Sequence, residues 1–250
     1  MSDIVTERSE NILSIQLNRP AKKNAMTSSM YITMAELLDG VAKDDEIRVV
    51  VWHAAGNSFS AGNDIEDFMK NPPAPGESPQ AQLIHALINF EKPLVAAVQG
   101  AAIGGGTTML AHCDFVYAGE SAKFQLPFVN LALVPEFGSS YLFPLRFGYT
   151  RAAELILLGG PFGASRAAEL GLVTQVVPDQ SVLGAATETA RTLAKKSAAA
   201  LQASKRLMKR AFREQLEQAV KLENEVFAER VRSDDAKNAF TAFFASRKPA

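Results

Sequence analysis

The sequence predicts an α/β protein, in which parallel strands alternate with helices. Continuous apolar runs rich in β-branched residues recur along the chain, and segments with helical spacing separate them. Parallel strands that are buried on both faces have this pattern, joined by right-handed helical crossovers. The chain has 250 residues, of which 47% are hydrophobic and 21% charged, as in ordinary globular domains. The runs are IRVVVWHAA (47–55), LVAAVQG (94–100), CDFVYAG (113–119) and LVTQVV (172–177).

The first elements follow from local signals. Residues 3–17 predict two short strands around a turn at Glu10 and Asn11. A cap signal at Thr27 to Ser29 predicts a helix through about residue 44, with apolar residues at helical spacing. Residues 71–80, NPPAPGESPQ, contain four prolines and predict an exposed irregular loop. This loop is either a lid over a bound substrate or a plain surface excursion.

The last part of the chain is expected to be helical. From about residue 181 the composition is dominated by helix formers. We divide the chain into a core (1–190) that carries the site and a helical region (191–250). One helix face is too apolar to be fully solvated, so this region packs on the body, on another subunit, or on both. That face contains Leu216, Val220, Glu223, Val226, Phe227 and Val231.

Composition excludes several classes of function. The 26 basic and 27 acidic residues give a net charge of -1, which argues against partners such as nucleic acid or an anionic membrane. A single cysteine, Cys113, suits a reducing compartment, and the acidic start MSDIVTERSE lacks a signal-peptide pattern. No apolar run reaches the roughly 18 residues typical of a membrane span. We therefore expect a cytoplasmic protein.

Two glycine-bearing junctions follow predicted strands, FSAGNDI (59–65) and GAAIGGGTT (100–108). Glycine lets a ligand approach the backbone, and the start of a helix exposes unpaired amide groups. Two such junctions can direct two N–H donors at one oxygen. Alternatively, the glycines at 104–106 only relieve crowding between helix and sheet. Neither junction has the spacing of a nucleotide-binding loop.

Five ordered blocks resemble the enoyl-CoA hydratase/isomerase family, also called the crotonase family. This resemblance implies a crotonase-like spiral of ββα units with a helical C-terminal oligomerisation region, which forms a homotrimer or a dimer of trimers. It also implies acyl-CoA thioester substrates, with an oxyanion hole formed by the amides of Asn63 and Gly105. The blocks are NRPAKKNAM (18–26), FSAGNDIEDF (59–68), AVQGAAIGGGTTMLAHCDFVYAG (97–119), KFQLPFVNLALVPEFGSSYLFP (123–144) and AAELGLVTQVV (167–177).

The sequence departs from the hydratase pattern at two positions. Hydratases of this family use two glutamates, and Thr108 and Phe128 stand at the matching positions. Glu136, in LVPEFGSSY, instead resembles the catalytic glutamate of the peroxisomal-type Δ3,Δ2-enoyl-CoA isomerases. Its apolar neighbours are expected to raise its pKa and strengthen it as a base. Alternatively, Glu136 caps the N-terminus of the helix that follows it.

The resemblance also implies residues that contact CoA, which enters as part of the substrate and not as a separate cofactor. They are Lys22, Lys23, Ala61, Gly62, Asp64 and Ile65. A second basic stretch, with Lys205, Arg206, Lys209, Arg210 and Arg213, is interpreted as a solvated helix face.

Other polar residues are assigned structural or surface roles. His112, Cys113 and Asp114 are consecutive, so their side chains diverge. Glu66 and Asp67 are placed on a solvated helix face, with Glu66 as an alternative second acid. His53 and His85 lack a second ligand at metal spacing, so we expect no metal site.

The sequence therefore predicts an acyl-CoA isomerase that converts a 3-enoyl-CoA into the trans-2-enoyl-CoA during fatty acid breakdown. Glu136 would transfer the proton, and the amides of Asn63 and Gly105 would hold the thioester oxygen. An enoyl-CoA hydratase, or another reaction through a thioester enolate, is the alternative within the family. A member that binds acyl-CoA without catalysis is the alternative from another class. Acyl chain length and the choice between trimer and hexamer stay open.

Overall fold

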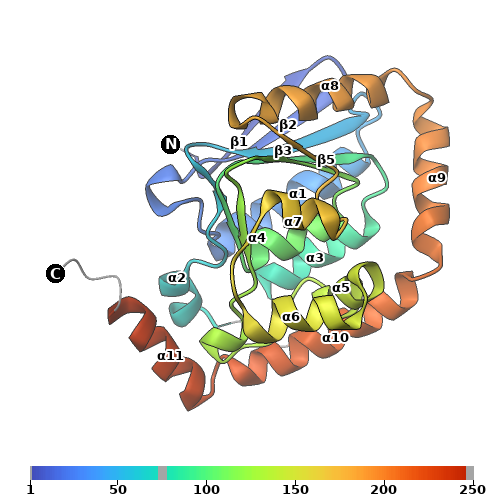
Figure 1. Cartoon of the computed structure of the whole chain (residues 1–250). Helices are drawn as coiled ribbons and strands as arrows, with labels where there is room; N and C mark the ends of the chain where they lie inside the picture. The colour runs from blue at the N-terminus through green and yellow to red at the C-terminus, as the bar shows by residue number, and fades with distance from the viewer. Residues whose placement is uncertain (1, 73–77, 246–250) are drawn as a thin grey trace.

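A six-stranded sheet forms the centre of the computed structural model, which describes residues 2–72 and 78–245 (Figure 1). Its strand order is β1-β2-β3-β5-β7-β10. The strands are β1 (Ile4–Ser9), β2 (Ile12–Leu17), β3 (Val49–Ala54), β5 (Leu94–Val98), β7 (Phe115–Gly119) and β10 (Gln175–Val177).

The predicted hairpin and the predicted parallel strands are both confirmed. β1 and β2 pair antiparallel around Glu10, whose φ is 55°. From β2 to β10 every neighbouring pair is parallel. Helices cover both faces of this sheet: α8 (Val182–Ala194) packs on one face, and α1 (Ser28–Ala42) and α3 (Pro79–Asn89) on the other (Figure 1). Apolar residues in these strands are therefore buried on both sides.

A second, four-stranded sheet was not expected from the sequence. It has the order β4-β6-β8-β9, and its strands are β4 (Ser58–Ser60), β6 (Ala101–Ile103), β8 (Lys123–Gln125) and β9 (Phe162–Gly163). Strands of two or three residues are too short for a recognisable alternation of side chains. Each of β3, β5 and β7 leads directly into one of these short strands, and helices follow. This succession confirms the predicted spiral of ββα units.

The remaining helices surround the two sheets. The region after residue 181 is helical, as predicted, and Leu216 and Phe227 of its apolar face are buried against the body. The predicted boundary between 190 and 191 lies inside α8. The helices are α2 (Ile65–Lys70), α4 (Gly105–Thr108), α5 (Ser139–Phe147), α6 (Tyr149–Leu158), α7 (Ala164–Glu169), α9 (Ala198–Arg210), α10 (Arg213–Arg230) and α11 (Asp234–Ala245). Short 3-10 turns are η1 (Pro20–Lys22), η2 (Met109–His112), η3 (Val129–Leu131) and η4 (Asp179–Ser181).

Two interpretations of the sequence need correction. The irregular loop predicted for 71–80 ends earlier, because Ser78 caps α3 and residues 79–80 are its first turn. Residues 73–77 of that loop, and with them the predicted lid, lie outside the described residues. Lys205 is not part of a solvated face: it is 5% exposed and pairs with Asp114 at 2.6 Å. None of the helices in the described part of the chain combines the length and the hydrophobicity that a membrane span requires.

Candidate active site

The two glycine-bearing junctions meet at one edge of the small sheet. FSAGNDI begins in β4 and continues beyond it, GAAIGGG spans β6, and these strands are parallel neighbours. Their carboxyl ends therefore lie side by side. Gly62 has a φ of 84°, and a Cβ there would lie 2.7 Å from the Ile103 carbonyl oxygen and 3.8 Å from the Gly105 nitrogen. Only glycine allows this approach of the two loops.

The backbone amides of Asn63 and Gly105 are left without a protein acceptor within the described ranges. Asn63 forms a parallel bridge with Met26, in which the hydrogen bonds use the Gly62 carbonyl and the Asp64 amide, each at 2.8 Å. The backbone N–H of Asn63 therefore points away from Met26. Gly105 is the first residue of α4, where an amide has no acceptor within the helix. Both residues line the same cavity, as an oxyanion hole requires.

The Glu136 carboxylate lies beside these amides and not at its own helix. The side chain is 4% exposed, and both of its oxygens accept long hydrogen bonds from Asn63 Nδ2, at 3.4 and 3.5 Å. A Cβ built on Gly105 would lie 2.9 Å from Glu136 Oε1, so the absence of a side chain at 105 makes room for the carboxylate.

The interpretation of Glu136 as a helix cap is wrong. The amides at the start of α5 donate to a different carboxylate, that of Glu223 in α10. Gly138 N–H donates to one of its oxygens at 2.6 Å and Ser140 N–H to the other at 2.8 Å. The Glu136 carboxylate does not bind these amides and lines the cavity instead.

Burial raises the pKa of two ionisable groups of the site, Glu136 and Tyr31. Desolvation raises the pKa of Glu136 to about 7, the Asn63 hydrogen bond opposes this rise, and the charge of Glu223 adds to it. Burial, and then the charge of Glu136, raise the pKa of Tyr31 well above its usual value. Tyr31 therefore keeps its hydroxyl proton and donates it to Asn63 Oδ1 at 2.7 Å. This bond turns the Asn63 amide nitrogen toward Glu136.

A cavity of about 580 Å³ opens onto this group of residues. Glu136 is the only carboxylate among the described residues that line it, and most of the wall is apolar. The apolar wall comes from the β8–α5 segment and from the C-terminal helices, with Phe128, Leu131, Leu133, Phe227, Phe240 and Phe243.

The two positions that carry glutamates in hydratases offer no acid here. Thr108 is fully buried, and its hydroxyl makes long hydrogen bonds to the Gly104 and Gly105 carbonyls. Phe128 is buried on the cavity wall, where its ring edge lies 3.9 Å from the Cβ position of Gly104. Phe128 therefore forms part of the cavity wall, and neither side chain is a carboxylate that could exchange a proton with a substrate.

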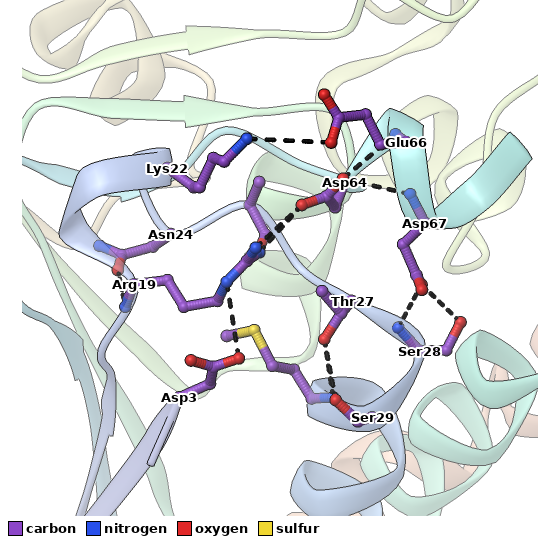
Figure 2. Close-up of polar contacts among 12 residues, drawn as sticks. Asp3, Arg19, Lys22, Asn24, Thr27, Ser28, Ser29, Asp64, Glu66 and Asp67 are labelled. Carbon is purple, nitrogen blue, oxygen red and sulfur yellow. Dashed lines mark hydrogen bonds and ion pairs between the residues drawn. The ribbon is translucent and has the colours of Figure 1, made fainter. Parts of the chain in front are cut away.

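A turn at residues 19–24 supports the loop FSAGNDI (59–65). Asn24 is buried with a φ of 54°, and its side chain donates to the Ala55 and Ser58 carbonyls and accepts from the Arg19 amide. Both terminal N–H groups of Arg19 donate hydrogen bonds to one Asp64 oxygen, each at 3.1 Å (Figure 2). The other Asp64 oxygen caps α2. The loop that presents the Asn63 amide is thus fixed on both sides.

The residues predicted to contact CoA fall into two groups. Lys23, Ala61, Gly62 and Ile65 line the cavity. Lys22 and Asp64 line a neighbouring hollow of about 330 Å³, which also includes Lys23, Ala61 and Ile65.

Three charged side chains at this hollow, those of Lys22, Asp64 and Glu66, have protein partners. The Asp64 carboxylate is bound by Arg19, and Lys22 pairs with the exposed Glu66 at 3.9 Å (Figure 2). Asp67 accepts from the amide and hydroxyl of Ser28, each at 2.7 Å. Neither acidic residue of α2 lines the main cavity.

The remaining candidates have structural contacts. His112 Nε2 donates to the Phe137 carbonyl at 2.8 Å, and burial is the main reason that its pKa falls to about 3. Cys113 is buried, and burial raises the pKa of its thiol to about 12. His53 and His85 bind Ser14 and Asn89. Across the described residues, no three His, Cys, Asp or Glu side chains converge as a metal would require.

Sequence reasoning missed several residues that shape the site, among them Arg19, Tyr31 and Glu223. Arg19 and Tyr31 act through partners distant in sequence, Asp64 and Asn63, which no local pattern reveals. Glu223 did carry a signal, because it is a carboxylate on an otherwise apolar helix face.

Comparison with known proteins places the chain in a family. A profile of the family described as "Enoyl-CoA hydratase/isomerase" matches residues 7–250. This chain belongs to the enoyl-CoA hydratase/isomerase family. The match agrees with the paired amides, the cavity and the ββα spiral, and this family acts on acyl-CoA thioesters.

Two relatives whose names give different activities resemble this chain to a similar degree. Human "Enoyl-CoA delta isomerase 2" is 34% identical over 98% of this chain and 64% of its own length. "Enoyl-CoA hydratase EchA19" of Mycobacterium tuberculosis is 35% identical over 99% of this chain and 95% of its own length. The solved structure of OdaA from Pseudomonas aeruginosa is 42% identical, covers 97% of this chain and 99% of its own, and superposes with a TM-score of 0.95. Sequence identity therefore does not separate isomerase from hydratase.

Proposed function

We propose that this enzyme isomerises a 3-enoyl-CoA to the trans-2-enoyl-CoA, with Glu136 as the single acid and base, in fatty acid breakdown. One observation carries the proposal. The buried Glu136 carboxylate is the only one among the described residues lining the cavity, and it lies beside the two unpaired amides of Asn63 and Gly105. Isomerisation needs one proton-transfer group, whereas the hydratases of this family use two.

The proposed reaction has two proton transfers. Glu136 removes a proton from C2, and the electron pair moves into the thioester, giving a dienolate. The amides of Asn63 and Gly105 donate hydrogen bonds to the negative oxygen, and losing one such donor typically costs about 3 kcal/mol. Glu136 then returns the proton to C4, so that the double bond ends between C2 and C3. Only a proton moves, so the reaction needs no redox cofactor.

The surroundings of Glu136 support this role. A pKa of about 7 leaves a substantial fraction of the carboxylate ionised near neutral pH. It also makes Glu136 a stronger base than an exposed glutamate, and its acid form can return the proton. The apolar wall limits the access of water that would compete for the dienolate.

Hydration is the alternative reaction, and the similarity to EchA19 favours it as much as the similarity to the delta isomerase favours isomerisation. Hydration requires a positioned water between two acid–base groups. Thr108 and Phe128 provide no second carboxylate, and for this reason we rank isomerisation first. A binding protein without catalysis would not need a buried carboxylate beside a paired amide site.

Activity measurements with two substrates test the proposal. Purified wild-type protein and Glu136→Gln are each given a 3-enoyl-CoA and, separately, a 2-enoyl-CoA. We expect the wild type to form the conjugated thioester from the first substrate, seen by its ultraviolet absorbance, and Glu136→Gln to be inactive. Faster hydration of the 2-enoyl-CoA would establish the alternative. Tight binding of both compounds without turnover would indicate a binding protein.

We also propose a homotrimer or a dimer of trimers. Exposed apolar residues on α9, Leu207 and Met208, are 68% and 67% exposed in the single chain and are suited to burial between subunits. Sedimentation equilibrium distinguishes these states, and a monomer at micromolar concentration would contradict both.

A further inference from the structure

The turn between Glu136 and α5 has an unusual backbone. Phe137 and Gly138 have φ values of 61° and 70°, so two consecutive residues adopt the left-handed conformation. For Phe137, which has a Cβ, this conformation is uncommon and persists only when the surroundings stabilise it. The direction in which the Glu136 side chain leaves the backbone depends on this turn.

Helix α10 packs directly against the turn. A Cβ built on Gly138 would lie 2.3 Å from Leu216 Cδ1 and 3.2 Å from Val220 Cγ2. On the same face of α10, the Glu223 carboxylate accepts the Gly138 amide at 2.6 Å and the Ser140 amide at 2.8 Å. The Gly138 and Ser140 amides, on either side of Ser139, form a concave site for an anion after this left-handed turn, and Glu223 fills it.

The opposite side of the turn is held by η2. His112 Nε2 donates to the Phe137 carbonyl at 2.8 Å, and since this pKa is about 3, the ring is neutral near pH 7. Three cations, Lys209, Arg146 and Lys205, favour that neutral form. Ser139 closes the turn, because its hydroxyl donates to the Glu136 carbonyl at 2.7 Å.

We propose that Glu223 is a positioning residue: it binds the Gly138 and Ser140 amides and thereby fixes the left-handed turn that aims the Glu136 carboxylate at the oxyanion hole. This inference rests on the proposed role of Glu136 as the base. It gives the C-terminal helix α10 a part in catalysis, although Glu223 does not line the cavity.

Glu223 affects Glu136 in two ways. Its hydrogen bonds fix the backbone, and its negative charge opposes ionisation of Glu136 and so adds to the rise of the Glu136 pKa. Among the described residues, the other polar side chains that face Glu136 include Asn63, whose side-chain amide donates to it, and Tyr31, which is neutral. A glutamine at 223 keeps the size of the side chain, but one of its two acceptors becomes a donor that faces a backbone amide.

The test compares Glu223→Gln with Glu225→Gln. Glu225 lies on the same helix, is exposed, and has the same charge to lose. For Glu223→Gln we expect kcat to fall at least about tenfold. KM is expected to stay within about twofold, and the pH midpoint of kcat/KM to move down. Glu225→Gln should match the wild type in all three. Glu223→Asp, which keeps the charge, should retain the wild-type pH midpoint.

A binding measurement separates a positioning role from a loss of folding. A saturated acyl-CoA, which cannot isomerise, should bind Glu223→Gln with the wild-type dissociation constant in calorimetry. If Glu223→Gln melts at a lower temperature but keeps the wild-type kcat and pH midpoint, Glu223 is only structural and the inference is overturned. Loss of acyl-CoA binding together with kcat would overturn it as well.

A readout without turnover distinguishes this inference from the proposed function. The free energy of unfolding is measured against pH for four proteins: the wild type, Glu136→Gln, Glu223→Gln and the double variant. At each residue 223, the difference between Glu136 and Glu136→Gln reports the pH at which Glu136 ionises. We expect the pH at which Glu136 ionises in the folded protein to move down when Glu223 is neutral. An unchanged value contradicts the inference. If the wild type fails to isomerise any 3-enoyl-CoA but the value still moves, the proposed function fails and the coupling stands.

Discussion

Replacement of Glu136 by glutamine should remove activity and, at alkaline pH, stabilise the fold. Burial raises the pKa of this carboxyl from 4.5 to about 7, so the folded protein binds the proton more tightly than the unfolded chain does. The free energy of unfolding must therefore fall as the pH rises above 4.5 and level off above about 7. One pKa unit corresponds to about 1.4 kcal/mol, which gives a total cost of about 3 kcal/mol. Glutamine has a similar shape and does not ionise, so it avoids this cost.

Urea unfolding at two pH values measures the effect. At about pH 8, Glu136→Gln should be more stable than the wild type by up to about 3 kcal/mol, and at about pH 4 the two should agree closely. At about pH 8, where Glu136 of the wild type is ionised, activity should fall by about 10²–10⁴-fold in Glu136→Gln, as expected for the loss of a general base.

The exposed Glu66 provides a matched control. Glu66→Gln removes the same charge from a side chain that is 62% exposed, and should show no comparable dependence on pH. A stability difference between wild type and Glu136→Gln that is the same at both pH values would refute the reasoning, because Glu136 would then have an ordinary pKa.

The remaining predictions concern the amide site, the turn, the buried ion pair and the pH profile. Gly105→Ala should lower kcat/KM about 10²–10³-fold, because its Cβ would lie 2.9 Å from Glu136 Oε1. The control Gly160→Ala, whose Cβ would have no atom within 4 Å, should keep the wild-type kcat/KM, and equal activities of the two variants would contradict the prediction. Asn24→Ala should lower the free energy of unfolding, measured in urea, by about 2–3 kcal/mol, because it removes buried hydrogen bonds to the Ala55 and Ser58 carbonyls. A loss below about 0.5 kcal/mol would show that these hydrogen bonds do not stabilise the fold. Lys205→Met should lower the free energy of unfolding by about 3 kcal/mol, because Asp114 is left without its cation. The double variant with Asp114→Asn should recover part of this loss, and no recovery would contradict the importance of the ion pair. In the wild type, kcat/KM should rise with pH through about 7 because the base must lose its proton, and a rate that falls over this range would contradict a carboxylate base.

Local signals in the sequence predicted the two glycine-bearing junctions and the buried acid, which the structure brings together at one cavity. Glycines after strands predicted the paired junctions, and a carboxylate among apolar residues predicted a perturbed acid at 136. Both are properties of short segments, so a linear pattern contains them. The large sheet was predictable for the same reason, because its strands are continuous apolar runs.

The errors came from contacts between distant segments. Lys205 was interpreted as solvated because its partner Asp114 is 91 residues away. The alternative of Glu136 as a helix cap failed because Glu223, 85 residues beyond Gly138, supplies the cap. The small sheet escaped prediction because its short strands are stabilised by neighbours and not by their own periodicity.

Transfer of a label within the substrate tests most directly whether Glu136 alone moves the proton. A 3-enoyl-CoA with deuterium at C2 is converted by the wild type, and the position of the label in the product is determined by mass spectrometry and NMR. Because the carboxylate is 4% exposed, part of the deuterium taken from C2 should reappear at C4 before it exchanges with water. Glu136→Gln should give no product. A product whose C4 carries only solvent hydrogen, or equal turnover by Glu136→Gln, would contradict a single-glutamate mechanism.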